Sequence, residues 1–224
     1  MTAPAPIRRH PPLTQVRDRT GLSLERNNPK RPPRDRMLLL ASEPALSYLQ
    51  DFLAHLKITE RVVSAAIPHE KDGILAIYQE RSKNAGPFRR VYCVLEWDGQ
   101  QETLMRQTWY ALQEAMTIET TGLRLICCRP SFDLWILLHF EEAGAEADDV
   151  TWLKNRVEHH LASPATLFDQ TKAYLEVAIQ RSMKMARERQ LKDIDDALLP
   201  GSPGVYLHEL MTFLRKQASK INNR

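Results

Sequence analysis

Two acidic side chains, Glu96 and Asp98, follow the short apolar run 91–95 of this 224-residue chain. Because they are two residues apart, their carboxylates point the same way in extended backbone and repel one another unless a cation or basic group lies between them. Mg²⁺ prefers oxygen ligands, keeps several waters and commonly takes one or two carboxylates together with substrate phosphates. The pair therefore predicts a Mg²⁺ site, with Mn²⁺ as a second candidate ion.

Two further acids are candidates for the same site. Glu43 follows the apolar run 37–41, and Asp133 comes shortly after the run 123–127. An acid from a second strand would complete a site in which one or two ions stabilise the oxygens of a phosphodiester during displacement. The alternative is that all these residues are ordinary loop acids, with Asp133 a first-turn acid favoured by exposed helix N–H groups. Spacing alone favours that alternative.

The segments around these acids predict an α/β fold. Short runs that are apolar throughout alternate with helical patterns, at 37–41, 62–67, 91–95 and 123–127. This alternation indicates a parallel sheet of about four strands flanked by helices, and from about residue 148 only helices are predicted, over 149–161, 170–192 and 203–219. Ligands bind such sheets outside the carboxyl ends of the strands, which is where the candidate acids lie. We therefore predict a core over 36–147 and a C-terminal helical extension, 148–224, packed on it.

The first 36 residues differ in composition from the rest. They hold nine Lys/Arg against three acids, a net +6, and seven of the 14 prolines, whereas the remainder is −3. Because large apolar side chains are few, residues 1–35 are predicted to be a disordered, Pro-rich basic arm. Either the arm lies along a nucleic-acid backbone, with Arg31, Arg34 and the adjoining Arg36 displacing counterions, or it is a solubilising tail. Both alternatives stay open.

Several other classes of protein find little support. The chain contains no GxxxxGK[ST], GxGxxG or strand-linked GxSxG pattern, which disfavours common nucleotide-binding folds and serine hydrolases. No apolar run reaches the roughly 18 residues that span a bilayer, and the N-terminal residues lack the apolar centre of a secretory signal. The three cysteines, Cys93, Cys127 and Cys128, cannot all pair, so we predict buried thiols and a cytoplasmic location.

The stretch RPSFDLWILLHFE, residues 129–141, is the most distinctive part of the chain. Its large apolar side chains recur at helical spacing, and His139 is predicted to be packed and hydrogen-bonded rather than a ligand. The stretch resembles the Asn-Pro-x-Phe-Glu-Leu-Trp pattern, with a following apolar run and His-Phe, of the RloB-like family, which is encoded near bacterial restriction or other phage-defence genes. VYCVLEWDG at 91–99 is similar to that family's strand followed by Asp-x-Asp, and SPGVYLHEL at 202–210 is a weaker match.

The resemblance covers about residues 36–215 and implies a Toprim-like core, in which a Glu after the first strand and a later Asp-x-Asp hold Mg²⁺ for phosphodiester chemistry. The chain departs from the pattern after the first strand, where the expected Glu falls on Ser42 and Glu43 stands one place late. Glu96 replaces the first Asp of the pair. A ligand displaced by one residue can point away from the ion, and a placement error of about 1 Å can cost on the order of 100-fold in rate.

Two functions follow from the resemblance, and both stay open. The first is a Mg²⁺-dependent Toprim-type nuclease or phosphodiester-processing protein of a phage-defence system. Its metal ligands would be Glu43, Glu96 and Asp98, with Asp133 as a further ligand or orienting metal-bound waters, and Arg129 contacting phosphate. The second is a catalytically degenerate protein that keeps the fold and binds nucleic acid or a partner ATPase, of AAA or ABC type, from a neighbouring gene.

Overall fold

The computed structural model describes residues 36–67, 73–85, 88–96, 123–161, 164–188 and 204–222, all within one unit of the chain, Pro32–Arg224. Three residues of the predicted site or nucleic-acid interface, Asp98, Arg31 and Arg34, lie outside the described residues, as does the predicted basic arm. No helix in the described ranges combines the length and the apolar composition that a membrane span requires.

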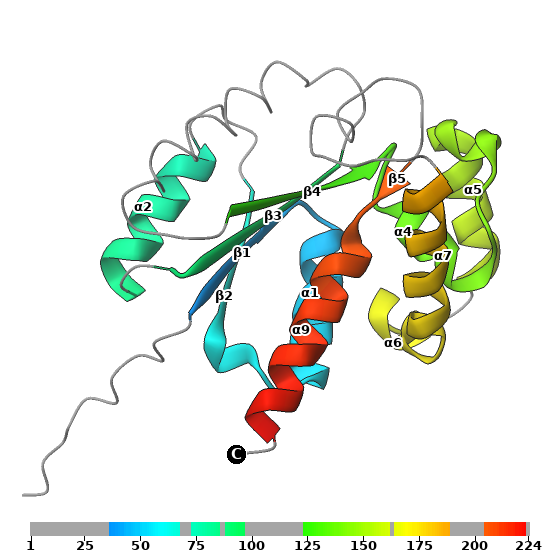
Figure 1. Ribbon diagram of the computed structural model, residues 1–224. Coiled ribbons are helices and arrows are strands. Elements are labelled where there is room, and N and C mark those ends of the chain that lie inside the picture. The colour runs from blue at the N-terminus through cyan, green and yellow to red at the C-terminus, as the bar shows by residue number, and fades with distance from the viewer. Residues whose placement is uncertain are drawn as a thin grey trace, which may run out of the picture. The chain divides into compact units, whose positions relative to one another are not determined.

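A sheet of five described strands, in the order β2-β1-β3-β4-β5, forms the centre of this unit (Figure 1). The strands are β1 Met37–Ala41, β2 Val62–Ala66, β3 Arg90–Glu96, β4 Leu123–Arg129 and β5 Gly204–Val205. The four predicted strands are present and parallel, which confirms the α/β fold. The prediction that strands stop at about residue 148 is wrong, because β5 pairs antiparallel with the end of β4. Two residues carry no periodicity, so such a strand leaves no signal in the sequence.

Strand β1 is apolar throughout because both of its faces are covered. All five of its residues are buried. Leu38 and Leu40 pack in one cluster, with Tyr78 of α2 (Gly73–Ala85), whereas Leu39 and Ala41 belong to the larger core on the other face. This is the pattern expected of a central parallel strand between two layers of helices.

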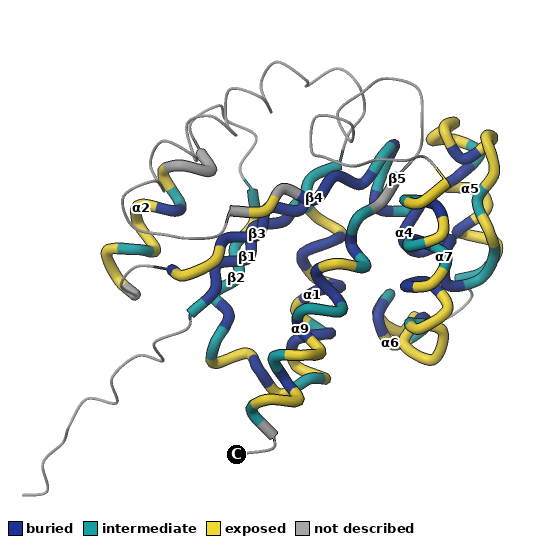
Figure 2. The backbone as a smooth tube through the Cα atoms, in the orientation of Figure 1, coloured by how far each residue is buried: buried dark blue, intermediate teal, exposed yellow. Residues whose placement is uncertain are grey.

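The larger core lies on the face covered by α1 (Ala45–His55), α4 (Asp133–Phe140) and α9 (Leu207–Asn222). Figure 2 shows α4 buried along nearly its whole length, whereas α9 is buried on one side only. The buried residues of α9 are Leu207, Leu210, Met211, Leu214 and Ala218. The ring of Phe213 lies 5.6 Å from that of Tyr92 in β3, so the C-terminal helix packs directly on the sheet.

The other C-terminal helices all contact α4. They are α5 Val150–His160, α6 Leu167–Thr171 and α7 Leu175–Glu188, with short 3-10 turns at Thr59–Arg61, Ala145–Asp148 and Lys172–Tyr174. Of these helices, α7 also contacts β5 and α9. The predicted helix over 170–192 therefore begins later than expected, at Leu175, and the one over 203–219 begins at Leu207, after β5. Asp149 is the N-cap of α5, since its Oδ1 accepts hydrogen bonds from the backbone N–H groups of Thr151 and Trp152.

The three cysteines are buried free thiols, as the sequence predicts. Burial raises the pKa of Cys93 and of Cys127 to about 12. The pKa of Cys128 is raised well above its usual value, first by burial and further by the neighbouring Cys127 and Glu96. These groups therefore stay protonated and serve as small apolar side chains.

Candidate functional site

The carboxyl ends of β1, β3 and β4 meet at one edge of the sheet. Ala41 pairs with Val94, and Glu96 pairs with Cys128, so the three strands end within a few residues of one another. The ladder continues beyond β1, where the Ser42 N–H donates to the Val94 carbonyl at 3.4 Å. Glu43, one residue further along, therefore emerges beside the end of the neighbouring strand that carries Glu96.

Glu96, the last residue of β3, is hydrogen-bonded to the start of α4. Its Oε1 accepts a hydrogen bond from the backbone N–H of Phe132, at 3.0 Å, and Phe132 is the residue that precedes the first turn of α4. An anionic side chain is favoured at this position because the first N–H groups of a helix have no intrahelical acceptor. The carboxylate is half-buried, and one of its oxygens is oriented by this bond.

Glu43 plays a similar part at α1. Its Oε2 accepts from the Oγ–H of Ser47 at 2.8 Å and from the Ser47 N–H at 3.3 Å, both in the first turn of that helix. The preceding Ser42 has a buried Oγ with no hydrogen-bond partner among the residues that the structure describes. A buried, unsatisfied hydroxyl is uncommon in folded proteins, so it marks this edge as a place where a polar group is unmatched.

Asp133, the first residue of α4, belongs to a different electrostatic environment. Its pKa is raised, chiefly by burial; the positive charge of Lys154 opposes the rise and the negative charge of Glu158 adds to it. Both charges are carried by α5, so Asp133 is coupled to that helix. Its own N–H donates to the Oγ of Ser131 at 3.3 Å.

The described acids do not form a complete metal site. Within the described ranges, no three Asp, Glu, His or Cys side chains gather closely enough to hold an ion. Asp98, the second member of the strand-end pair, lies outside those ranges, so the predicted set of Glu43, Glu96 and Asp98 stays a prediction. The chemistry of the edge fits a hard cation, because two carboxylates and the unsatisfied Ser42 hydroxyl all supply oxygen.

The two described arginines that were predicted to contact nucleic acid lie at opposite ends of the sheet. Arg129 ends β4 at the carboxyl edge, where it pairs with Gly204 of β5. Arg36 precedes β1 at the amino edge. They cannot contact the same phosphate, since β1 alone spans about 17 Å at the usual rise per residue.

His139 is buried and structural, as the sequence predicts. Its Nδ1–H donates to the Trp135 carbonyl at 2.9 Å, so its Nε2 accepts from the hydroxyl of Tyr48 at 3.1 Å. Burial lowers the pKa of His139 to about 4, and the charge of Arg181 contributes in the same direction. The ring is therefore neutral at physiological pH, with both nitrogens engaged within the core.

Comparison with known proteins finds a family model that matches most of the chain. A family model described as RloB-like protein matches residues 43–214, which span both glutamates, all of α4 and the first half of α9. A search of curated proteins finds no match.

Proposed function

This chain belongs to the RloB-like family, and we propose that it is a Mg²⁺-dependent, Toprim-like nuclease or related phosphodiester-processing protein of a phage-defence system. The observation that supports the proposal is that β1 and β3 are adjacent parallel strands, so Glu43, which follows β1, and Glu96, which ends β3, lie at the same edge of the sheet. Parallel α/β sheets bind their ligands at that edge.

The proposed roles follow from these positions. Glu43, Glu96 and Asp98 would hold one or two Mg²⁺ ions, and such ions supply positive charge to the oxygens of a phosphodiester as it is displaced. The bond from the Phe132 N–H fixes the orientation of Glu96 before any substrate arrives. Asp133, with its raised pKa, orients water at the start of α4, and Arg129 contacts substrate phosphate.

The test is cleavage of labelled single- and double-stranded DNA and RNA with Mg²⁺ or Mn²⁺. We expect Glu96→Gln to lose at least about 100-fold in rate, because a neutral amide binds a divalent ion weakly. Without the ion, no positive charge at this site faces the negative charges of the substrate. Glutamine still accepts a hydrogen bond, so the contact with Phe132 can persist and the variant should fold. Chelation with EDTA should stop cleavage, and added Mg²⁺ should restore it.

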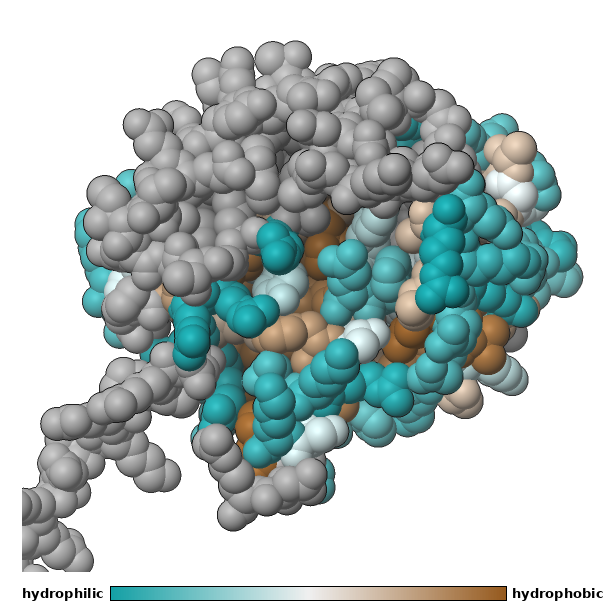
Figure 3. All heavy atoms as spheres, viewed as in Figure 1, coloured by the Kyte–Doolittle hydropathy of each residue, from teal (hydrophilic) through white to brown (hydrophobic). Residues whose placement is uncertain are grey.

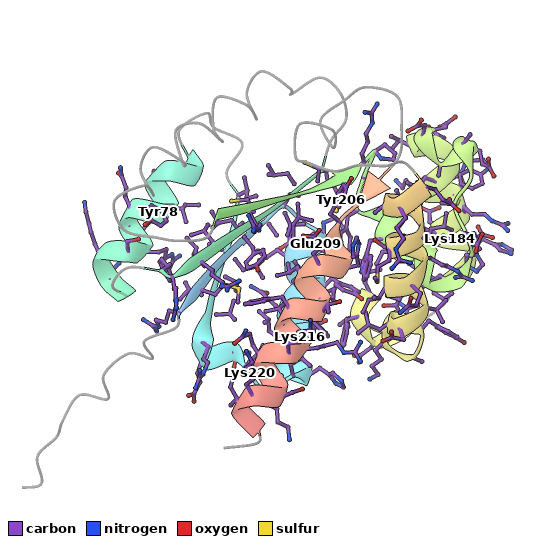
Figure 4. All side chains as sticks on the ribbon, in the orientation of Figure 1. Tyr78, Lys184, Tyr206, Glu209, Lys216 and Lys220 are labelled. Carbon is purple, nitrogen blue, oxygen red and sulfur yellow. The ribbon has the colours of Figure 1, made fainter. Side chains whose placement is uncertain are left out.

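Glu209→Gln serves as the matched control, because Glu209 is an exposed acid near the start of α9 (Figure 4). It should cleave at the rate of the wild-type protein. Equal rates in Glu96→Gln and Glu209→Gln would reject the proposed metal site. Asp98→Ala tests the remaining acid in the same assay and should also be inactive.

A second candidate is a catalytically degenerate protein that binds nucleic acid or a partner ATPase. The specific observation in its favour is that the carboxylate of Glu43 is already engaged by Ser47, while Ser42 stands where the family has its Glu. Calorimetric titration separates the two candidates. Binding of Mg²⁺ or Mn²⁺ that disappears in Glu96→Gln supports the nuclease, whereas nucleic-acid binding without any metal binding supports the degenerate protein.

A further inference from the structure

The amino edge of the sheet, opposite the candidate metal site, opens into a cavity of about 220 Å³. Five basic residues line it: Arg36, Arg61, Arg89, Arg90 and Lys220. We call this cavity the basic pocket. No Asp or Glu is among the described residues that line it.

The basic pocket is assembled by the parallel sheet from segments far apart in the chain. Met37 pairs with Val62 on one side and with Arg90 on the other, so the residues that enter β1, β2 and β3 lie next to one another. The Arg89 N–H donates to the Arg36 carbonyl at 3.0 Å, and this bond joins the residue that precedes β3 to the residue that precedes β1. The last turn of α9 adds Lys220 from the C-terminal end of the chain.

Three of the basic residues have no acidic partner in the part of the chain that the structure describes. Arg61, Arg90 and Lys220 form no ion pair with any carboxylate among the described residues. The C-terminus of α9 contributes only about half a negative charge, which is small beside several full positive charges. Like charges gathered around a concave site raise the local potential and favour an anionic ligand.

One arginine of the pocket is oriented in advance. The guanidinium carbon of Arg90 lies 4.5 Å from the centre of the Phe213 ring, so its plane is supported by a cation–π contact. A guanidinium presents its N–H donors as a planar fork, which matches two oxygens of a phosphate better than an ammonium does. The amide of Gln217 adds a neutral hydrogen-bonding group to the same lining.

The basic surface continues beyond the pocket along α9. A second hollow is lined by Thr212, Arg215, Lys216, Ser219 and Lys220, and it shares Lys220 with the basic pocket. Arg215 is ion-paired with Glu176 at 2.6 Å, so the positive charge of this surface comes from Lys216 and Lys220. Figure 4 shows Lys216 and Lys220 successively along α9, and Figure 3 shows hydrophilic side chains interspersed with apolar ones over this part of the molecule. A surface that continues in this way suits an extended chain of phosphates better than a single small anion.

We propose that the basic pocket is a phosphate-binding site, filled by a phosphate of a nucleic-acid strand whose backbone continues along α9. The site is distinct from the candidate metal site, since β1 separates the two edges of the sheet by about 17 Å. At about 3.4 Å per nucleotide along a duplex strand, that separation corresponds to about five phosphates. One nucleic acid of modest length can therefore reach both edges. A free nucleotide offers the same phosphate chemistry, and the experiment distinguishes it.

The experiment measures binding of short fluorescent single-stranded DNA and RNA by anisotropy, in EDTA, so that its outcome does not depend on the metal site. The pocket variant is Arg61→Gln/Arg90→Gln, and the control is Lys83→Gln/Arg187→Gln, which removes two exposed positive charges outside the pocket. Lys83, Arg90 and Arg187 are exposed and Arg61 is half-buried, and thermal melting checks that both variants fold. We expect the pocket variant to bind at least about tenfold more weakly, and its salt slope to fall by about 1.4 for two lost phosphate contacts on a single strand. The salt slope of the control should differ from that of the wild-type protein by less than about 0.7.

Three outcomes are distinguishable. Weaker oligonucleotide binding in the pocket variant alone supports the proposal. If the pocket variant binds oligonucleotides as the wild-type protein does but no longer binds AMP by calorimetry, the pocket is a phosphate site for a free nucleotide instead. If the pocket and control variants bind both probes equally well, the basic pocket is no phosphate site. Arg61→Lys/Arg90→Lys should recover only part of the lost affinity, because charge is restored without the planar fork.

Discussion

Replacing Phe132 by alanine is expected to lower the free energy of unfolding by about 3–5 kcal/mol, the usual cost of truncating a fully buried phenylalanine. Phe132 has no exposed surface, and its ring meets that of Tyr48 edge-on with 5.4 Å between the ring centres. It stands where β4 turns into α4, a helix buried along almost all its residues. The neighbouring helices therefore cannot readily close the cavity that alanine would leave, and urea unfolding monitored by circular dichroism measures the loss.

The same substitution should disturb the candidate site. The backbone N–H of Phe132 is the group that orients Glu96, so any shift of the first turn of α4 moves that carboxylate. A displacement of about 1 Å at a reacting group can cost on the order of 100-fold in rate. Metal binding and cleavage should therefore fall under conditions in which the variant is still folded, such as low temperature.

Phe132→Leu is the control for this prediction. Leucine fills most of the volume of the phenylalanine, so we expect a loss of only about 1–1.5 kcal/mol and nearly unchanged metal binding. An alanine variant as stable as the leucine variant would show that this part of the core relaxes freely. In that case the packing of α4 against the sheet could not be what positions Glu96.

Strands β1 and β3 were predictable because burial of a strand on both faces requires apolar side chains at successive positions. A strand covered on both faces must be apolar throughout, and the run 37–41 therefore identified β1 without other information. The same holds for the apolar part of β3, although the strand itself extends by one residue at each end, to Arg90 and Glu96. β5 escaped prediction because its two residues are held by the backbone of β4 and leave no mark on side-chain periodicity.

The edge of the sheet at which Glu43 and Glu96 lie was predictable, whereas the contacts of their side chains were not. That Glu43 and Glu96 share one edge follows from the parallel order of the strands. The contact between Glu96 and the Phe132 N–H joins residues 36 apart, and local spacing cannot reveal such a contact. The basic pocket was missed for the same reason, since its arginines are close only after β1, β2 and β3 have paired.

The free energy of unfolding is expected to fall by about 3 kcal/mol through one buried histidine as the pH drops from 6.5 to 4. Exposed histidines, whose pKa is the same in the folded and unfolded chain, contribute nothing to this fall. The cause is His139, which has 1% of its surface exposed and whose pKa burial lowers from 6.5 to about 4. Above pH 6.5 the ring is neutral in both the folded and the unfolded chain, and the full stability is present. As the pH falls, the unfolded chain takes up a proton that the folded chain excludes, so the balance shifts toward unfolding.

The surroundings of His139 leave no route by which the folded state could accept that proton easily. The hydroxyl of Tyr48 already donates to Nε2, and burial raises the pKa of this tyrosine to about 12, so it supplies no negative charge. Arg181, whose Nη1 donates to the Leu138 carbonyl at 2.9 Å, places a positive charge nearby. A protonated ring would lose the tyrosine bond and add a second positive charge within the core.

Urea unfolding at a series of pH values measures the effect, with His139→Gln and His159→Gln as a matched pair. Glutamine at position 139 should lower stability at neutral pH but flatten its dependence on pH, because the titrating group is gone. Glutamine at position 159, which is exposed on α5, should leave the dependence close to that of the wild-type protein. The slope of unfolding free energy against pH, rather than its absolute value, decides the matter. Identical slopes in the wild-type protein and His139→Gln would mean that the folded core admits the charged ring, and that the network joining α1 to α4 through Tyr48 is more open than its hydrogen bonds indicate.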